Sequence, residues 1–201
     1  MRCRGCGAAL FRRLTREWGG LDVLCANAGI AGPTAAIEDV TLDDWRACVR
    51  VNLEGAFLCA KHAAPSMKAQ RSGAMLFTSS TAGLYGYPNR APYASAKWAL
   101  HGLMKTLAME LGPFGIRANV ICPGAVEGPR IEGVLNREAA LKGTTRDAIY
   151  RGYASGTSMR TFVTAQDIAG MAVFLASDAA RYVSGQAIAV DGHTENPDPK
   201  V

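Results

Sequence analysis

Short apolar runs alternate along the chain with longer segments whose apolar residues recur at helical spacing. The apolar runs predict four buried strands, at residues 21–27, 73–78, 116–122 and 187–190. The helical spacing predicts helices at residues 8–18, 41–65, 92–111 and from 164 onward. Residues 125–160 mix Arg and Glu with Gly, and we expect them to be irregular. Strands that alternate with helices predict an α/β fold with a parallel sheet.

Local signals mark the ends of these helices. Thr41 precedes Asp44 by three positions, and Thr164 precedes Asp167 in the same way, which is the spacing of a helix capping box. Pro65 marks the expected end of the second helix. These signals mark two helix starts and one helix end. No internal repeat is visible in the sequence.

Ligands of parallel α/β sheets bind beyond the carboxyl ends of the strands. The residues that follow the first three predicted strands are therefore the candidates for a site. These residues are Asn27, Ala28 and Gly29, then Ser79 and Ser80, then Pro123 and Gly124.

The helix at 92–111 has hardly any polar face. A helix that is apolar on nearly all sides is buried on nearly all sides. One side would face the sheet and the other a second subunit, so we expect a homo-oligomer. Coverage of the helix by residues 125–160 is the alternative.

Composition excludes several classes of protein. Of the 201 residues, 49% are hydrophobic and 19% charged, which excludes a disordered chain. The net charge of +5 permits an anionic partner, but no aromatic residues are interleaved with the arginines near the start, so we expect no nucleic acid binding. A targeting presequence is a second interpretation of those arginines, and a solvated helix face is the favoured one. No apolar run approaches the length of a membrane span, and we expect no membrane partner.

The six cysteines and three histidines do not form a recognisable metal motif. Cys3 and Cys6 form a single C-x-x-C pair with no second pair at zinc spacing, and the histidines lie far apart. We therefore predict no metal site. The remaining cysteines lie in apolar surroundings, which favours reduced thiols and a cytoplasmic protein.

Tyr93 and Lys97 lie four positions apart at the start of the helix at 92–111, so they share one face. An ammonium close to a phenol favours the phenolate, which can exchange a proton with an alcohol or carbonyl oxygen. Ser80, thirteen positions before Tyr93, can orient that oxygen. These side chains move a proton, but none supplies a hydride, so a nicotinamide would have to do so.

Six short motifs occur in the same order in this chain as in a known protein family. They are Ala26-Asn27-Ala28-Gly29, Val51-Asn52, Ser79-Ser80, Tyr93-Ala-Ser-Ala-Lys97, Gly115-Ile-Arg-Ala-Asn119 and Pro123-Gly124. Together they resemble the classical short-chain dehydrogenase/reductases over about Leu10 to Gly192. The resemblance implies a Rossmann-like, doubly wound parallel sheet, NAD or NADP as cofactor, and a small alcohol or carbonyl compound as substrate.

The resemblance also implies roles for individual residues. The catalytic set would be Tyr93 as acid and base, Lys97 to favour the phenolate and hold the nicotinamide ribose, Ser80 to position the substrate oxygen, and Asn52 to anchor a relaying water. The other cofactor-binding residues would be Asn27, Ala28 and Gly29 near the adenosine side, and Pro123 and Gly124 beside the nicotinamide. Residues after Gly124 would act as a substrate lid. Where the family usually has a threonine, this chain has Glu127-Gly128-Pro129, which leaves contacts to the carboxamide in doubt.

The family's fold also begins with a strand, a glycine-rich turn for the pyrophosphate and a helix. Gly5-Cys6-Gly7 is the only candidate for this turn, but no strand precedes it and Leu10 stands where a third glycine is expected. We therefore expect a truncated dehydrogenase domain at residues 1–192 that lacks most of its front half, and a loose tail at 193–201.

Two hypotheses follow from this mixture of features. One is an NAD(P)-dependent oxidoreductase whose full length includes an upstream segment. The other is a cofactor-free remnant that serves as an oligomerising interaction module. In either case we expect the 201-residue chain to bind NADH very weakly at best, and a fluorescence titration that gave micromolar affinity would contradict this.

Overall fold

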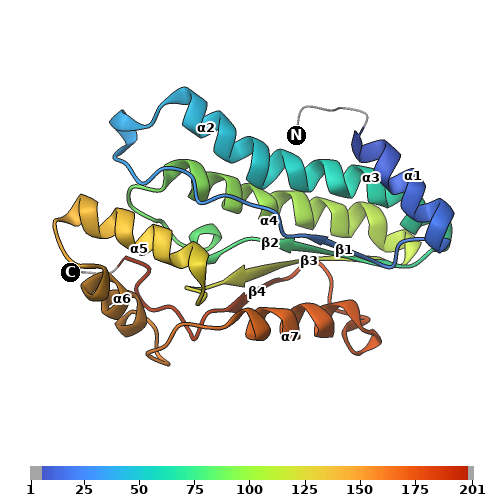
Figure 1. Ribbon diagram of the computed structural model, residues 1–201. Helices are drawn as coiled ribbons and strands as arrows, with labels where there is room; N and C mark the ends of the chain where they lie inside the picture. Colours follow the sequence, from blue (N-terminus) through green and yellow to red (C-terminus); the bar gives the residue numbers. More distant parts are fainter. Residues whose placement is uncertain (1–5, 199–201) are drawn as a thin grey trace.

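The computed structural model describes residues 6–198 and confirms a single α/β domain with a parallel sheet. The strands are paired in chain order and are β1 (Val23–Ala26), β2 (Gly73–Thr78), β3 (Ile116–Pro123) and β4 (Ala187–Val190). The helices are α1 (Cys6–Trp18), α2 (Leu42–Val49), α3 (Gly55–Gln70), α4 (Ala91–Leu111), α5 (Pro129–Lys142), α6 (Arg146–Ser155) and α7 (Ala165–Ala176). Figure 1 shows α3 and α4 on one face of the sheet, α7 on the other, and α5 and α6 at one end.

The two faces of the sheet bury alternate residues of each central strand. In β2, Met75 and Phe77 pack toward α3 and α4, whereas Leu76 packs toward Leu175 of α7. Successive side chains of a strand point to opposite faces, so both faces need a helical cover. This is why β2 is a continuous apolar run from Ala74 to Phe77.

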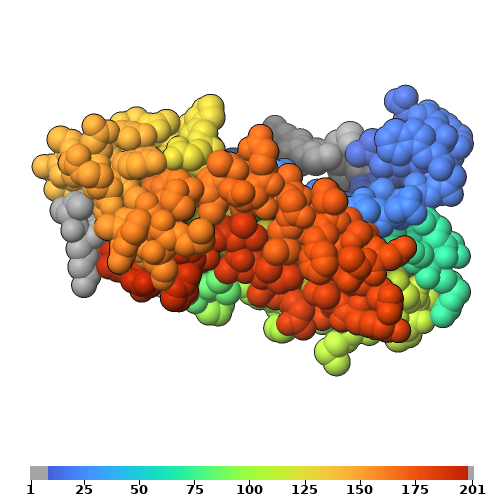
Figure 2. Space-filling view, turned by 90° about the horizontal axis from the view of Figure 1, so that it is seen from below, coloured from blue at the N-terminus to red at the C-terminus, as the bar shows by residue number. Residues whose placement is uncertain are grey.

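The β1 strand lies at the edge of the described sheet and is only partly covered. It pairs with β2 in register, with Leu24 opposite Met75. Leu24 is buried, but Val23 is 39% exposed and Cys25 is also exposed. Figure 2 shows the face that carries α7, with α5 and α6 at one end of the molecule and α1 at the other.

The structure corrects the prediction of one helix from Thr41 to Pro65. Thr41 caps α2 as expected, accepting a hydrogen bond from the backbone of Asp44, but a π-helical turn at residues 50–54 joins α2 to α3. Pro65 lies inside α3, which continues to Gln70. Burial of Ala63 and Met67 on either side of the proline offsets the hydrogen bond that it cannot donate.

The prediction that residues 125–160 are irregular is wrong. They contain α5, which starts with Pro129 and ends at Gly143 in the left-handed conformation, and α6, which is capped by Thr145. Both helices pack on a separate small core around Leu135 and Ile149. The apolar stripe was hidden because charged residues and Gly133 interrupt it.

Other predictions concern the two ends of the chain. Cys3 and Gly5 lie outside the described residues, so the C-x-x-C pair and the start of the Gly5-Cys6-Gly7 segment cannot be placed. Near the other end, Thr194 is buried and bridges to Thr157, within the stretch expected to be a loose tail. The proposed domain boundary after Gly192 stays a prediction.

Candidate active site

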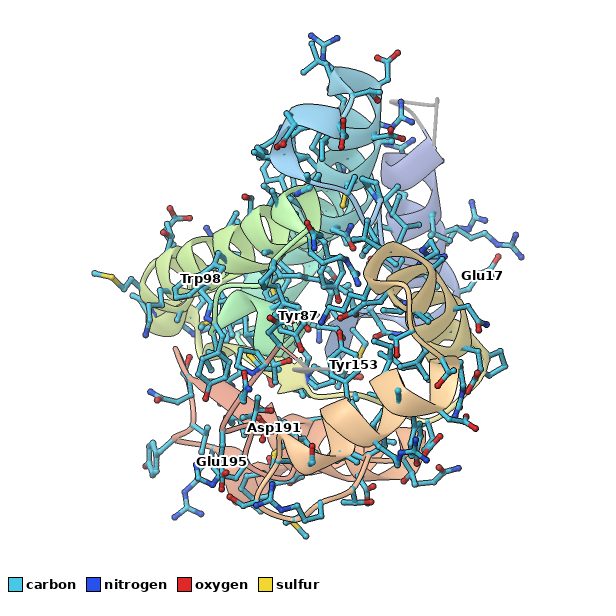
Figure 3. All side chains as sticks on the ribbon, turned by 90° about the vertical axis from the view of Figure 1, so that its left-hand side faces the viewer. Glu17, Tyr87, Trp98, Tyr153, Asp191 and Glu195 are labelled. Atoms are coloured by element: carbon cyan, nitrogen blue, oxygen red, sulfur yellow. The ribbon has the colours of Figure 1, made fainter. Side chains whose placement is uncertain are left out.

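A cavity of about 560 Å³ opens at the carboxyl ends of β1, β2 and β3. Figure 3 looks onto this end of the sheet, and Tyr87 and Tyr153 lie next to each other near the centre of the view. The expected site residues that line the cavity are Asn27, Ser79, Ser80, Tyr93, Lys97, Pro123 and Gly124. The fold therefore brings together side chains from three strand ends and the first turns of α4.

The start of α4 positions Tyr93 and Lys97 in the cavity. Pro92 lies in the first turn, where its missing N–H has no helical acceptor to lose. The amine nitrogen of Lys97 lies 5.6 Å from the centroid of the Tyr93 ring. Lys97 is 3% exposed, and its ammonium donates a hydrogen bond of 2.7 Å to the carbonyl of Thr78 at the end of β2.

Burial lowers the pKa of Lys97 to about 8 from its ordinary value of 10.5. The positive charge of Arg130, which also lines the cavity, lowers it further, and the thiols of Cys48 and Cys122 act in the opposite direction. The Lys97 amine can thus gain or lose its proton slightly above neutral pH. A change in its surroundings can therefore change its protonation state at a pH close to neutral.

This lowered pKa predicts a measurable dependence of stability on pH. Between about pH 8 and 10.5 the unfolded chain keeps a proton on Lys97 that the folded chain has released. Stability therefore rises with pH in this window, by up to roughly 3 kcal/mol. Urea unfolding at several pH values should show this rise in the wild type relative to Lys97→Met. The Lys61→Met variant on the exposed face of α3 should keep the wild-type dependence, and a rise that survives in Lys97→Met would contradict the assignment.

The two serines after β2 differ in their surroundings. Ser80 is partly exposed and lines the cavity, and its hydroxyl accepts a hydrogen bond from the backbone of Ala82. Ser79 is buried and donates to the carbonyl of Lys97, with His101 at 3.1 Å on its other side. Ser79 thus joins the strand end to α4, whereas the hydrogen of the Ser80 hydroxyl can bond a ligand.

Asn52 lies beside the cavity rather than in its wall. The π-helical turn places its side chain against the loop after β1, where the amide accepts from the N–H of Ile30 and donates to the carbonyls of Ile30 and Cys48. A Cβ on Gly29 would lie 2.5 Å from the amide oxygen of Asn52 and 3.5 Å from the amine of Lys97. Gly29 is therefore needed for the loop to pass this close to both side chains. Ala28 is exposed and does not line the cavity.

The sequence did not single out several cavity residues. Arg90 and Arg130 line the wall with no recognisable motif around them. Tyr87 and Tyr153 also line the cavity. Tyr150 instead stacks on Phe162 with ring centroids 4.2 Å apart. The one sequence signal that could have pointed to Arg90 is its position immediately before the start of the predicted helix at 92–111.

Within residues 6–198, no three side chains of the metal-binding types lie close enough to hold an ion. In the same range, no helix has both the length and the apolar character that a membrane crossing requires.

Comparison with known proteins identifies the family. The family model described as enoyl-(acyl carrier protein) reductase matches residues 5–193. The chain belongs to the short-chain dehydrogenase/reductase family. Over 186 residues it is 41% identical to trans-4-hydroxycyclohexanecarboxylate dehydrogenase of Sinomonas cyclohexanicum, covering 92% of this chain and 63% of that relative. The chain thus spans less than two thirds of the length of this family member.

Solved structures of family members have the same fold. The structure of NAD⁺-bound xylitol dehydrogenase superposes with a TM-score of 0.91 at 28% identity, covering 94% of this chain and 75% of that one. The structure of ElxO with NADP bound has a TM-score of 0.82 at 27% identity, covering 92% and 72%. The family therefore includes members bound to either dinucleotide.

Proposed function

We propose that the protein is an NAD(P)-dependent oxidoreductase that interconverts a secondary alcohol and a carbonyl compound. The observation that carries this proposal is that Ser80, Tyr93 and Lys97 line one cavity at the strand ends, with the Lys97 amine 5.6 Å from the Tyr93 ring. Family membership supports the same reaction class.

The residues present fit the nicotinamide end of a dinucleotide. The Lys97 ammonium carries three donor hydrogens, yet among the described residues it has one hydrogen-bond acceptor, the carbonyl of Thr78. A buried ammonium with unused donors suits the hydroxyls of a ribose. Asn27, Pro123 and Gly124 line the same cavity and would border the bound cofactor. A nicotinamide bound here supplies the hydride donor or acceptor of the reaction.

The protein's own residues would handle the proton. In the oxidation direction the Ser80 hydroxyl and the phenolate oxygen of Tyr93 would both bond to the hydroxyl group of the alcohol, and Tyr93 would accept its proton as the alcohol becomes a carbonyl. The ammonium of Lys97 would stabilise the phenolate from which this proton transfer starts. In the reverse direction Tyr93 would return the proton to the carbonyl oxygen while Ser80 holds it in place.

Asn52 would support the catalytic residues from outside the cavity wall. Its two hydrogen bonds with Ile30 hold that loop against the π-helical turn, and this loop carries Gly29 beside Lys97. We propose that Asn52 fixes this geometry and, as the family resemblance implies, anchors a water through which Lys97 exchanges protons. A cofactor-free interaction module would have no need for these buried polar contacts, so the second hypothesis is not favoured.

The proposal also covers the oligomeric state of the protein and its location in the cell. The outer face of α4 exposes Trp98 by 51% and Met109 by 81%, and residues 125–160 do not cover these side chains. We propose that a second copy of the chain covers this face in a homo-oligomer. Among the residues that the structure describes, Cys25, Cys48, Cys59 and Cys122 are free thiols, which supports the proposed cytoplasmic location.

A steady-state assay tests the proposed reaction. Purified protein is mixed with NAD⁺ or NADP⁺ and a panel of secondary alcohols, and reduced dinucleotide is followed by its absorbance. We expect reduction that depends on both alcohol and dinucleotide, with one of the two cofactors preferred. Equal rates with and without alcohol would contradict the proposal. A version extended at its N-terminus, run in parallel, separates weak cofactor binding from absent chemistry.

A further inference from the structure

The cavity contains a buried arginine whose charge is not paired. Arg90 immediately precedes α4 and is 7% exposed. One of its terminal nitrogens donates a hydrogen bond of 3.0 Å to the carbonyl of Ala31. Its Nε is buried and has no hydrogen-bond partner among the described residues. Within residues 6–198 Arg90 also forms no ion pair with a carboxylate.

Two acidic side chains in this part of the molecule are bonded to other groups. Glu138 is buried, but it accepts a hydrogen bond of 2.7 Å from the hydroxyl of Tyr153 and lies 3.3 Å from the ammonium of Lys142. Glu127 lines the cavity and accepts a hydrogen bond from Tyr150. The guanidinium carbon of Arg90 lies 5.0 Å from the centroid of the Tyr93 ring, which gives it a cation–π contact.

Three of the charged side chains that line the cavity are basic and one, Glu127, is acidic, so the wall carries a net positive charge. Arg90 and Lys97 are both buried, and Arg130 lines the same cavity and lowers the proton affinity of Lys97. Burying a charge without a partner is costly, so a bound anion that pairs with Arg90 would be strongly favoured there. A guanidinium offers a planar fork of donors, which matches a flat carboxylate better than a point charge does.

We propose that Arg90 binds the carboxylate of the substrate, so that the natural substrate is a hydroxy acid or the corresponding oxo acid. This inference rests on the proposed function, because it names the substrate class of the same site. The guanidinium lies over the ring of Tyr93, so the carboxylate would be held on the side of the cavity next to the acid–base residue. Tyr87 and Tyr153 line the cavity and would contact the apolar body of the substrate. Arg130 would add to the positive potential that attracts the anion.

Equilibrium binding tests the inference without requiring turnover. Cyclohexanecarboxylate and cyclohexanecarboxamide have nearly the same shape and differ in charge, so the ratio of their dissociation constants isolates the effect of the carboxylate. In titrations of the wild-type protein followed by ligand NMR signals, we expect the carboxylate to bind tighter by roughly tenfold or more. Arg90→Gln should bring the ratio close to unity, and Arg90→Lys should restore part of it.

Two controls keep this result interpretable. Arg137→Gln removes the same charge from the exposed face of α5, outside the cavity, and should keep the wild-type ratio. Thermal unfolding of each variant shows whether it is folded, and Arg90→Lys serves if Arg90→Gln is not. A wild-type ratio near unity, or a preference that survives in Arg90→Gln, would overturn the inference. Because the readout is binding, it can fail while the alcohol assay succeeds, or succeed while that assay fails.

Discussion

Tyr93→Phe is expected to abolish nearly all alcohol-dependent reduction of the dinucleotide. The substitution removes the hydroxyl that would exchange the proton, and positioned acid–base groups contribute roughly 100- to 10,000-fold to rate. The fold should be unaffected, because within residues 6–198 no hydrogen bond involves the Tyr93 hydroxyl while its ring, which faces Lys97 and Arg90, is kept. The measurement is kcat of the purified variant beside its thermal unfolding curve.

A matched control uses a tyrosine outside the cavity. Tyr182 is 89% exposed, and Tyr182→Phe removes the same atom without touching the site. This control should keep the wild-type rate. If Tyr93→Phe kept a rate near that of Tyr182→Phe, Tyr93 could not be the acid–base residue.

The second large effect is expected from Asn52→Leu, and it should appear in both stability and activity. Leucine has a similar volume but leaves the N–H of Ile30 and the carbonyls of Ile30 and Cys48 without the partners they have now. A buried group left unsatisfied costs about 1–3 kcal/mol, and the two groups of Ile30 are only partly buried and so cost less, which gives an expected loss of about 2–4 kcal/mol in the free energy of unfolding. Urea unfolding measures this loss.

The loop that Asn52 holds also carries Gly29 beside Lys97, so turnover should fall with it. Asn136→Leu on the exposed face of α5 is the control and should change stability little. An Asn52→Leu variant as stable as Asn136→Leu would show that the loop does not depend on these hydrogen bonds.

The sequence predicted the parts of the fold that local patterns determine. The β2 strand was recognisable because a parallel strand buried on both faces is a short, continuous apolar run, whereas β1 and β4 lie at the sheet edges and are exposed at alternate residues. The cap at Thr164 was recognisable because its reciprocal hydrogen bonds with Asp167 require only residues three positions apart. The sequence also indicated that Tyr93 and Lys97 share a face, since helical spacing alone sets that relation.

What the sequence could not predict depends on contacts between distant residues. Pro65 stays inside α3 because tertiary burial outweighs a local breaking signal. Helices α5 and α6 form because Leu135 and Ile149 meet each other across their loop, which no single stretch of sequence shows. Arg90 enters the cavity through a contact with Ala31, fifty-nine positions away in the chain. The role we propose for Arg90 depends on its having no ion pair within residues 6–198, which only the folded arrangement reveals.

The most direct test of the account follows a single hydrogen atom. A secondary alcohol that is turned over in the steady-state assay is prepared with deuterium on the carbon that bears the hydroxyl, and the reduced dinucleotide is analysed by mass spectrometry. The account predicts that the deuterium moves into the dinucleotide with the wild-type protein and that Tyr93→Phe forms almost none of this product. Deuterium that appeared in the solvent instead, or reduced dinucleotide without the label, would contradict hydride transfer at this site.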